Sequence, residues 1–406
     1  MRIQYSILPI LSAALMAALT ASWPAGAATV ERPVITPSLV HLEPRASRQF
    51  KIEITGRPAT SVSWSVNDVA GGNAEFGHIT PAGIYTAPAN APTPHEIHIH
   101  AIVTRPHKIH AWATVLMSQG APTYRLVAKW GEKGTGPGKF IDPHSLCFDR
   151  EGNLIITDAN GGHVYRYTKE GKYLGEIGSG PGSAPGQFKG PRDVKVDAAW
   201  NIFVSDGGNQ RIQVFSPSGK FLRSFGQKGT APGEMLRVHA IWFTPSNRLY
   251  AADVDNSRIM VFSDLGKYLF AWGKAGTGPG EFHAPHGLGG DANGDIFVSN
   301  YWGSCQKFTA SGKYLFEFAV PDPNGFTHAH SMNSDRWGDA YIMARDKANR
   351  AAIVKYNNNG TPIATWPPLR PMKEWGVKFA AIDSDGTVYA AVESKDTVGI
   401  EIYREQ

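Results

Sequence analysis

A repeat of about 47 residues fills the C-terminal two thirds of the chain and constrains its fold more than any other feature. Its units begin, at intervals of 48, 47, 47, 44 and 49 residues, at Phe140, Phe188, Met235, Phe282, Phe326 and Trp375. Each unit holds four short apolar runs separated by turn sequences. Repeats of this length with four strands each indicate propeller blades, so we predict an all-β protein with a six-bladed β-propeller.

The two ends of the repeat region complement each other. The last unit stops at "IEIYREQ" (400–406), which is its third strand, while "YRLVAKWGEKGTGPG" (124–138) matches the fourth-strand sequence "KYLFAWGKAGTGPG" (267–280). We therefore expect residues 124–406 to close into a ring, with the N-terminal strand completing the last blade and no free sheet edge.

The segment before the propeller has a different pattern. Residues 29–117 alternate apolar and polar positions in runs such as "SVSWSV" (61–66) and "EIHIHAIV" (96–103), which predicts a small antiparallel sandwich. The stretch "GGNAEFGHITPAGIYTAPA" (71–89) resembles bacterial immunoglobulin-like domains. His98 and His100 share one strand face, where we expect a solvent-facing pair rather than a metal site. Residues 118–123 have the composition of a linker.

The N-terminus has the pattern of an export signal. Arg2 precedes an apolar run over residues 7–19, and the small residues "AGAA" (25–28) follow. This run is short for a membrane span, so we predict a signal peptide over residues 1–28 and a periplasmic or extracellular protein. No later segment is apolar enough to span a membrane. Cys147 and Cys305 fall three units apart, so we expect no disulfide between them.

Charge and composition narrow the choice of partners. The formal net charge is +5, and the Lys and Arg residues are scattered through turns rather than gathered in one run. This distribution argues against nucleic-acid binding. We expect a monomer, because a closed ring leaves no sheet edge for a partner to cover. The expected ligand is a small-molecule or peptide-derived substrate, or alternatively a protein of the cell envelope.

The repeat alignment places a nitrogen base at one position in every unit. The fifth residue of the first strand, counted in the last unit back from Asp383, is in turn His144, Arg192, His239, His286, His330 and Lys378. The first strand of a blade lines the central channel, so these side chains should ring the axis near one mouth. Six cations there would repel one another in a low-dielectric channel.

Three arrangements resolve this conflict. Neutral imidazoles can share a metal ion while Arg192 and Lys378 hold an anion, the whole ring can bind an anion without metal, or hydrogen-bonded histidines and water can plug the channel. Alternate blades lie about 120° apart, so His144, His239 and His330 can converge on one axial point. Three histidines leave a coordination position open, as in catalytic zinc sites, where bound water has a pKa of about 7.

The end of each second strand returns to the same mouth. The residues there are Asp158, Asp206, Asp253, Asn300, Tyr301, Arg345 and Glu393. We expect the aspartates to cap turns. Tyr301, Arg345 and Glu393 break that pattern and are candidates for contact with a substrate, although packing explains them equally well.

The repeat sequence also carries a family resemblance. "FKGPRDVKVDAAWNIFVSDGGNQRIQVFSPSGKFLRSFG" (188–226) resembles the NHL repeat, and "PHSL" (143–146) with "AADVDNSRIMVF" (251–262) looks like the family of peptidyl-α-hydroxyglycine α-amidating lyase. That family splits a carbinolamide into an amide and glyoxylate on zinc. The resemblance implies that His144, His239 and His330 are zinc ligands and that the carbonyl of Leu146 binds a structural calcium.

The sequence departs from that family at four positions. Gly208 stands near the place of its catalytic tyrosine, Glu393 near that of its substrate-binding arginine, and Ser331 in place of an aspartate. His286 stands in a blade where the family has no histidine.

We therefore predict Tyr301 and His286 as catalytic residues, with Tyr301 replacing the general base. The predicted substrate anchors are Arg192, Arg345 and Lys378. Two functions stay open: a zinc-dependent lyase or hydrolase acting on a small anionic or carbonyl substrate, and a non-catalytic binding module that holds an anionic ligand or a protein partner.

Overall fold

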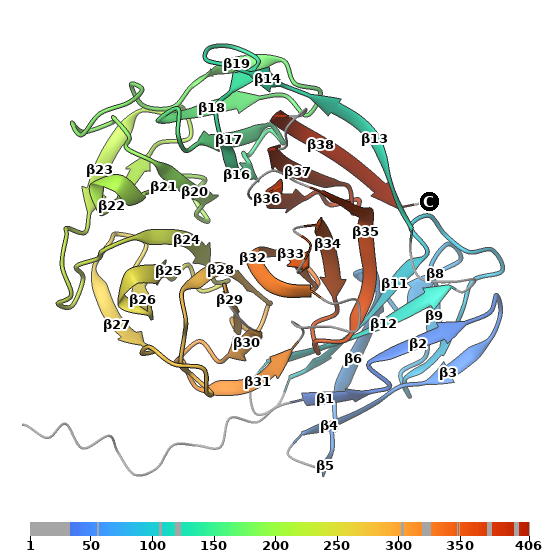
Figure 1. The fold of residues 1–406 in the computed structure, drawn as a ribbon. Helices are drawn as coiled ribbons and strands as arrows, with labels where there is room; N and C mark the ends of the chain where they lie inside the picture. The colour runs from blue at the N-terminus through green and yellow to red at the C-terminus, as the bar shows by residue number, and fades with distance from the viewer. Residues whose placement is uncertain are drawn as a thin grey trace, which may run out of the picture.

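The computed structural model shows a protein built almost entirely of strands (Figure 1). It describes residues 33–54, 57–104, 108–117, 123–301, 304–318, 326–346, 348, 350–371, 376–393 and 398–405. The predicted signal peptide and all but the last residue of the predicted linker lie outside these ranges. Within them, no helix is long and apolar enough to cross a membrane.

Six four-stranded antiparallel sheets surround a central axis, as the repeat predicts (Figure 1). Blades 1 to 3 consist of β16 (Pro143–Phe148), β17 (Leu154–Asp158), β18 (His163–Tyr167) and β19 (Tyr173–Glu176); β20 (Pro191–Val196), β21 (Ile202–Asp206), β22 (Arg211–Phe215) and β23 (Phe221–Phe225); and β24 (Val238–Phe243), β25 (Leu249–Asp253), β26 (Arg258–Phe262) and β27 (Tyr268–Trp272). Blades 4 to 6 consist of β28 (Pro285–Gly290), β29 (Ile296–Asn300), β30 (Cys305–Phe308) and β31 (Tyr314–Phe318); β32 (Phe326–Ser334), β33 (Ala340–Asp346), β34 (Arg350–Tyr356) and β35 (Pro362–Pro371); and β36 (Gly376–Ile382), β37 (Val388–Glu393), β38 (Val398–Glu405) and β13 (Tyr124–Trp130).

Blade 6 closes the ring in the predicted way. Its strand order is β13-β38-β37-β36, and β13 pairs antiparallel with β38 from Tyr124 opposite Glu405 to Trp130 opposite Ile400. Figure 1 shows β13 running beside β38 although the two strands lie at opposite ends of the propeller sequence. The chain thus joins its first and last propeller strands in one sheet, which removes the edge that an open ring would expose.

Small connecting elements lie between the blades. The pair β14 (Glu132–Lys133) and β15 (Lys139–Phe140) leads into blade 1. Two single-turn 3-10 helices, η1 (Gly207–Asn209) and η2 (Val254–Asn256), follow the second strands of blades 2 and 3.

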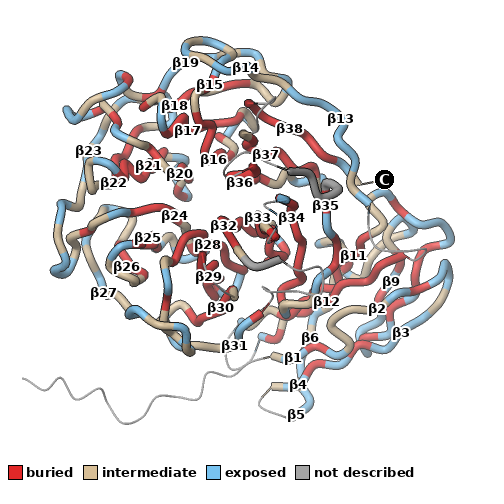
Figure 2. The backbone as a smooth tube through the Cα atoms, viewed as in Figure 1, coloured by how far each residue is buried: buried red, intermediate tan, exposed pale blue. Residues whose placement is uncertain are grey.

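The hydrophobic core fills the spaces between blades. The first strands are mostly buried, whereas the fourth strands β19 and β23 alternate partly buried and exposed residues, as Figure 2 shows for β16 and β19. The aromatic or methionine residues that open the first four units, including Phe140 and Met235, are fully buried. Cys147 in blade 1 and Cys305 in blade 4 are buried free thiols. Burial of these apolar side chains is the main stabilising contribution to each interface between blades.

The N-terminal unit forms three small sheets of its own. They consist of β1 (Pro33–Thr36), β4 (Lys51–Ile54) and β5 (Arg57–Pro58); β3 (Ser47–Gln49), β10 (Ile84–Thr86), β9 (Gly77–Ile79) and β8 (Gly72–Asn73); and β2 (Leu39–Leu42), β12 (Ile109–Met117), β11 (Glu96–Val103), β6 (Val62–Val66) and β7 (Val69–Ala70). The pairing is antiparallel as expected, except that β2 pairs parallel with β12. Phe50, Tyr85 and Ile97 belong to its separate core.

The prediction of a solvent-facing pair at His98 and His100 is wrong. The two side chains are buried on β11, with His98 stacked on Trp337 of the propeller and His100 stacked on Trp112. This face is covered because the N-terminal unit packs against the propeller, where Lys355 of β34 binds Glu96 of β11.

Candidate functional site at the propeller axis

All six axial residues stand at irregularities in the first strand of their blades. The pairing with the second strand shifts between Pro143 and Ser145, Pro191 and Val194, Val238 and Ile241, Pro285 and Gly287, Ala329 and Ser331, and Val377 and Phe379. A β-bulge turns a side chain out of the regular alternation of the strand. The repeated bulge therefore brings one side chain from each blade to the same cavity.

Hydroxyl groups compensate for the pairing that the bulges interrupt. In three blades the amide after the axial residue donates to a hydroxyl of the second strand: Ser145 to Thr157 at 2.9 Å, Asp193 to Ser205 at 2.7 Å and Gly287 to Ser299 at 2.8 Å. Buried backbone N–H groups need such partners. The Thr157 hydroxyl also donates to the carbonyl of Arg192 at 3.2 Å, which ties blade 1 to blade 2.

The axial cavity has a volume of about 330 Å³ and collects the predicted ring. Its lining residues are His144, Arg192, Arg237, His239, Val254, Ala284, His286, Tyr301, His330 and Lys378. Five blades of the propeller thus supply a histidine or arginine, and the sixth a lysine. No carboxylate belongs to this set of described lining residues.

A hydrogen bond between neighbouring blades orients each histidine. The Nδ1 atoms of His144, His239 and His286 lie 2.8, 3.0 and 2.5 Å from the carbonyl oxygens of the next axial residues. Nδ1 of His330 lies 3.4 Å from the carbonyl of Lys378. Because a carbonyl oxygen only accepts, Nδ1 carries the proton in a neutral ring and Nε2 keeps its lone pair.

The buried environment keeps these rings neutral. Burial, and then the neighbouring charged groups, hold the pKa of His144, His239 and His330 well below the usual value. Burial likewise lowers the pKa of His286 to about 3. The repulsion expected of six axial cations is therefore absent at neutral pH, because four of the six groups are uncharged.

Three cationic groups complete the cavity wall. Lys378 Nζ lies 3.2 Å from Glu393 Oε2 and 3.4 Å from Asp142 Oδ1, so its charge is partly balanced. The Arg192 guanidinium forms no ion pair within the described part of the chain, and burial lowers its pKa. An arginine of this kind is suited to bind a carboxylate or phosphate through two parallel N–H donors.

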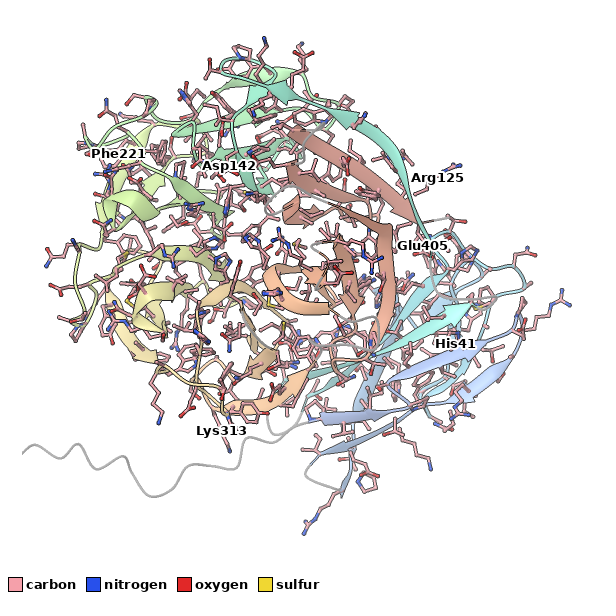
Figure 3. All side chains as sticks on the ribbon, in the orientation of Figure 1. His41, Arg125, Asp142, Phe221, Lys313 and Glu405 are labelled. Carbon is pink, nitrogen blue, oxygen red and sulfur yellow. The ribbon has the colours of Figure 1, made fainter. Side chains whose placement is uncertain are left out.

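Sequence reasoning missed the third cation, Arg237. It stands two residues before His239, pairs with Asp255 at 2.7 Å, and lines the cavity. The same register position in blade 1 holds Asp142, which Figure 3 labels on the inner side of the propeller, and in blade 4 it holds the lining residue Ala284. Inspection of this second repeat position would have identified Arg237.

Tyr301 joins the histidines at the cavity. Its ring centroid lies 5.1 Å from that of His286 and 6.0 Å from that of His330, and its backbone amide donates to the carbonyl of Ala284 at 3.1 Å. Burial raises the pKa of Tyr301, so the phenol keeps its proton at neutral pH. This proton suits Tyr301 to donate a hydrogen bond or a proton rather than to act as a general base.

The other residues at the ends of the second strands lie outside the cavity lining. Arg345 pairs across blade 5 with His328, and Glu393 binds Lys378. The three aspartates and the asparagine accept backbone amides ahead of the first strand: Asp158 from Ile141 and Asp142, Asp206 from Lys189, Asp253 from Leu236 and Arg237, and Asn300 from His283. These hydrogen bonds hold the backbone ahead of each first strand, and the four side chains that accept them lie outside the cavity lining.

The axial histidines have the protonation state that a transition metal needs, but their ring nitrogens are not close enough to bind one ion together. Neutral rings with Nδ1–H bound to carbonyls present Nε2 lone pairs, the usual state of a metal-binding histidine. No three of the four described axial histidines bring ring nitrogens within 4.8 Å of one another, whereas three nitrogens on one zinc ion lie about 3.4 Å apart. Binding an ion there requires the rings to move inward.

The residues around Leu146 do not fit calcium. Leu146 is fully buried and pairs with Ile156. The carboxylate beside its strand, Asp193, already accepts from the Ser145 hydroxyl at 2.5 Å and from Lys195 Nζ at 2.7 Å. Calcium requires six to eight oxygen ligands, and the described residues form no acidic cluster at this place. The ammonium group of Lys195 supplies the positive charge next to this carboxylate.

Comparisons with known proteins support the propeller fold. The sequence model of the DUF5128 family, described as a 6-bladed beta-propeller, matches residues 237–368. No curated protein matches the sequence.

Solved structures resemble the chain along most of its length. A structural genomics protein of unknown function from Bacteroides thetaiotaomicron has 14% identity and a TM-score of 0.54, over 93% of this chain and 98% of its own. Virginiamycin B lyase from Staphylococcus aureus has 15% identity and a TM-score of 0.48, over 85% and 99% of the two chains. A gluconolactonase from Xanthomonas campestris has 10% identity and a TM-score of 0.48, over 66% and 87%. The repeat, the six observed four-stranded sheets and the matching family model make this chain a six-bladed β-propeller.

Proposed function

We propose that the axial cavity binds a small anionic substrate of carbinolamide or carbonyl type and cleaves it as a metal-dependent lyase. The observation that carries this proposal is the composition of the cavity wall. Three cationic side chains and four neutral imidazoles surround it, and no carboxylate lies among its described lining residues. An anion entering such a cavity is attracted by the surrounding charges and meets no repelling group.

The cations have distinct roles in the proposal. Arg192, which forms no ion pair within the described residues, provides the main anchor for a carboxylate group of the substrate. Lys378 has Glu393 and Asp142 nearby, so it contributes less charge and mainly positions the ligand. Arg237, bound to the exposed Asp255, attracts the anion at the mouth.

A divalent ion on His144, His239 and His330 would supply Lewis acidity that polarises an oxygen of the substrate. The support for this assignment is the chemistry of the donors, because all three rings are neutral and each directs Nδ1 to a carbonyl. The rings would have to approach one another to bind the ion. This requirement makes metal loading the first property to test.

His286 and Tyr301 are placed for proton transfer. In the proposed cleavage, Nε2 of His286 takes the proton of the substrate hydroxyl, the carbon–oxygen double bond forms, and the carbon–nitrogen bond breaks. The departing nitrogen takes its proton from the Tyr301 hydroxyl, and the proton on His286 then restores the phenol. A pKa of about 3 makes His286 a weak base in the free protein. A bound anion raises this pKa and strengthens the base.

A second function is supported by the separation of the ring nitrogens. Without an ion, the same cavity is an anion-binding site, and the propeller is a non-catalytic binding module of the cell envelope. Arg192, Arg237 and Lys378 then carry the binding, and the histidines provide a neutral, hydrogen-bonded wall.

Elemental analysis separates the two functions. We would purify the mature protein without chelator or affinity metal, load it with Zn²⁺, and compare it with the His144→Ala/His239→Ala/His330→Ala variant. The lyase requires that the protein bind one more zinc ion per chain than the variant does, and that it release glyoxylate from an α-hydroxyglycine amide. Equal zinc content and no release of glyoxylate would leave the binding module.

Glyoxylate binding by calorimetry tests the anion site in either case. Replacing Arg192 with Gln removes the main anchor, so the affinity should fall by about tenfold or more, in line with the loss of one charge-assisted pair. The matched control Arg150→Gln removes an exposed arginine and should leave the affinity unchanged.

A further inference from the structure

A second group of potential metal ligands lies at the junction between the N-terminal unit and the propeller. Glu96 and His98 stand on β11, and Asp339 immediately precedes β33. Their exposed fractions are 3%, 6% and 2%, so all three are shielded from solvent. The sequence separates the two parts of this group by more than 200 residues, and the packing of the two units brings them together.

The donor atoms of these three residues converge. One oxygen or nitrogen from each lies within 4.8 Å of the other two, and Glu96 Oε1 lies 3.3 Å from His98 Nε2. Among the described residues, no other set of three acidic, histidine or cysteine side chains meets this distance. The geometry is therefore closer to that of a bound ion here than at the axial ring.

Two of the donor oxygens lack a hydrogen bond. Glu96 Oε1 and Asp339 Oδ2 are buried atoms without a hydrogen-bond partner. Burying a carboxylate oxygen in this way is costly, and such atoms call for an explanation, of which an ion is one. Both atoms belong to residues of the converging group, so they point to a ligand at the same place.

The nearby lysine binds the other oxygen of Glu96 and also lies close to Asp339 Oδ2. Lys355 Nζ binds the other oxygen of Glu96, Oε2, at 2.5 Å, and lies 3.3 Å from Asp339 Oδ2 and 3.9 Å from Asp335 Oδ2. One ammonium group thus faces three buried carboxyl groups. A divalent cation would bind these carboxyl groups in their ionised form.

The imidazole is held in place by its surroundings. The His98 ring stacks on Trp337 with centroids 4.5 Å apart and planes 13° apart, and the His98 amide donates to Asn67 Oδ1 at 2.8 Å. Fixing the ring in this way reduces the entropy lost when an ion binds. A cavity of about 410 Å³, lined by Glu96, His98 and Trp337 among others, adjoins the group and provides room for water at further coordination positions.

We propose that Glu96 Oε1, His98 Nε2 and Asp339 Oδ2 bind a divalent transition metal ion. One imidazole with two carboxylates favours zinc, manganese or iron(II) over the all-oxygen sites of calcium and magnesium. Glu96 and His98 come from the N-terminal unit and Asp339 from blade 5, so the ion links the two units. The site is separate from the axial ring, and this proposal does not depend on the proposed function of the axial cavity.

The test uses Zn²⁺ as the probe and the full mature chain carrying the His144→Ala/His239→Ala/His330→Ala substitutions, so that the axial ring binds no ion. We would measure zinc binding by calorimetry and thermal melting in this background. Asp339→Asn removes one ligand and keeps the side-chain shape, and His98→Gln is the second variant. Glu53→Gln, an exposed carboxylate on β4, is the matched control. Circular dichroism checks that each variant is folded.

We expect one zinc ion per chain in the background and a zinc-dependent rise in Tm, because an ion that binds only the folded state stabilises it. Asp339→Asn and His98→Gln should weaken binding by at least about tenfold, the lower bound seen when even a supporting group of a metal site is lost. The Glu53→Gln control should bind as the background does. Absence of zinc binding in the background, or undiminished binding in folded Asp339→Asn and His98→Gln proteins, would overturn the proposal.

Discussion

His239 and His286 contact each other across two neighbouring blades, with ring centroids 3.4 Å apart, planes tilted by 33° and the Nδ1–H of His239 donating to the His286 carbonyl at 3.0 Å. Two imidazolium ions at this separation would repel strongly in a buried site. The arrangement is therefore compatible with neutral rings, which agrees with the lowered pKa of both residues. Lowering the pH should consequently affect the stability of the whole axial ring.

We predict that stability falls on acidification below about pH 6.5. The unfolded chain protonates its histidines near this pH, whereas in the folded protein the pKa of His286 is lowered to about 3, so the unfolded state binds more protons between these values. The stabilisation is complete above the unfolded pKa and is lost as the pH falls towards the folded one. Urea unfolding at several pH values should show a loss of at least about 1 kcal/mol per pH unit in this range.

Replacing His286 with Asn should flatten this pH dependence, because one group with a lowered pKa is removed. The control His41→Asn removes an exposed histidine and should keep the slope of the parent. A pH dependence that is identical in the two variants would show that the axial ring does not control the response to acid.

Tyr301→Phe tests proton donation at the axial cavity. The substitution removes the hydroxyl and keeps the ring that contacts His286 and His330. If Tyr301 protonates the departing nitrogen, kcat for the α-hydroxyglycine amide should fall by about 10²-fold or more while KM changes little. Tyr173→Phe on β19 is the control. Loss of the alkaline limb of the pH–rate profile would distinguish proton donation from packing, and an unchanged kcat would remove Tyr301 from the mechanism.

Glu405 should give the opposite pH dependence at the junction of the two units. Burial raises the pKa of its carboxyl to about 7, and the side chain, labelled in Figure 3, accepts a hydrogen bond from the backbone amide of His95. The donor and acceptor atoms lie 2.7 Å apart. The folded state therefore binds more protons than the unfolded state between about pH 4.5 and 7. The stabilisation is complete below the unfolded pKa and is lost as the pH rises through the folded one.

Glu405→Gln should abolish this loss of stability between about pH 5 and 8, because the amide does not titrate. Unfolding of the Glu405→Gln and Glu53→Gln proteins over this range measures the difference. If both variants keep the pH dependence of the parent, Glu405 is not the responsible group.

The repeat made most of the propeller predictable from the sequence. Aligned units place His144 and His239 at one register position, and the structure places both at the cavity. The last unit was harder, because counting from Trp375 reaches Phe379, whereas counting back from Asp383 reaches Lys378. The structure puts Lys378 in the cavity wall and Phe379 against the rings of His144 and His239. A bulge between residues 377 and 379 accounts for the ambiguity.

The junction could not be predicted from periodicity. The run "EIHIHAIV" has the same alternation whether its polar face meets solvent or another unit, so His98 looked exposed. Its burial depends on Trp337 and on the ion pair between Glu96 and Lys355, two residues that are 259 positions apart in the sequence. Such contacts leave no repeating signal. The separation of the axial ring nitrogens cannot be predicted from the sequence either, because it depends on side-chain rotation rather than on strand register.

Closure of the ring gives a prediction about stability. Gly399 of β38 has a φ of +150°, and a Cβ atom there would lie 2.2 Å from the Trp130 carbonyl oxygen of β13, the strand that completes blade 6. Gly175 of β19 has the same φ of +150° and no atom within 4 Å of its Cβ position. The two alanine substitutions therefore impose similar backbone strain, but only Gly399→Ala also forces the closing strands apart. Gly399→Ala should lower the free energy of unfolding by about 1–3 kcal/mol more than Gly175→Ala, the usual cost of overpacking. Urea unfolding of both proteins measures this difference, and equal destabilisation would show that the contact between β13 and β38 does not limit the stability of the ring.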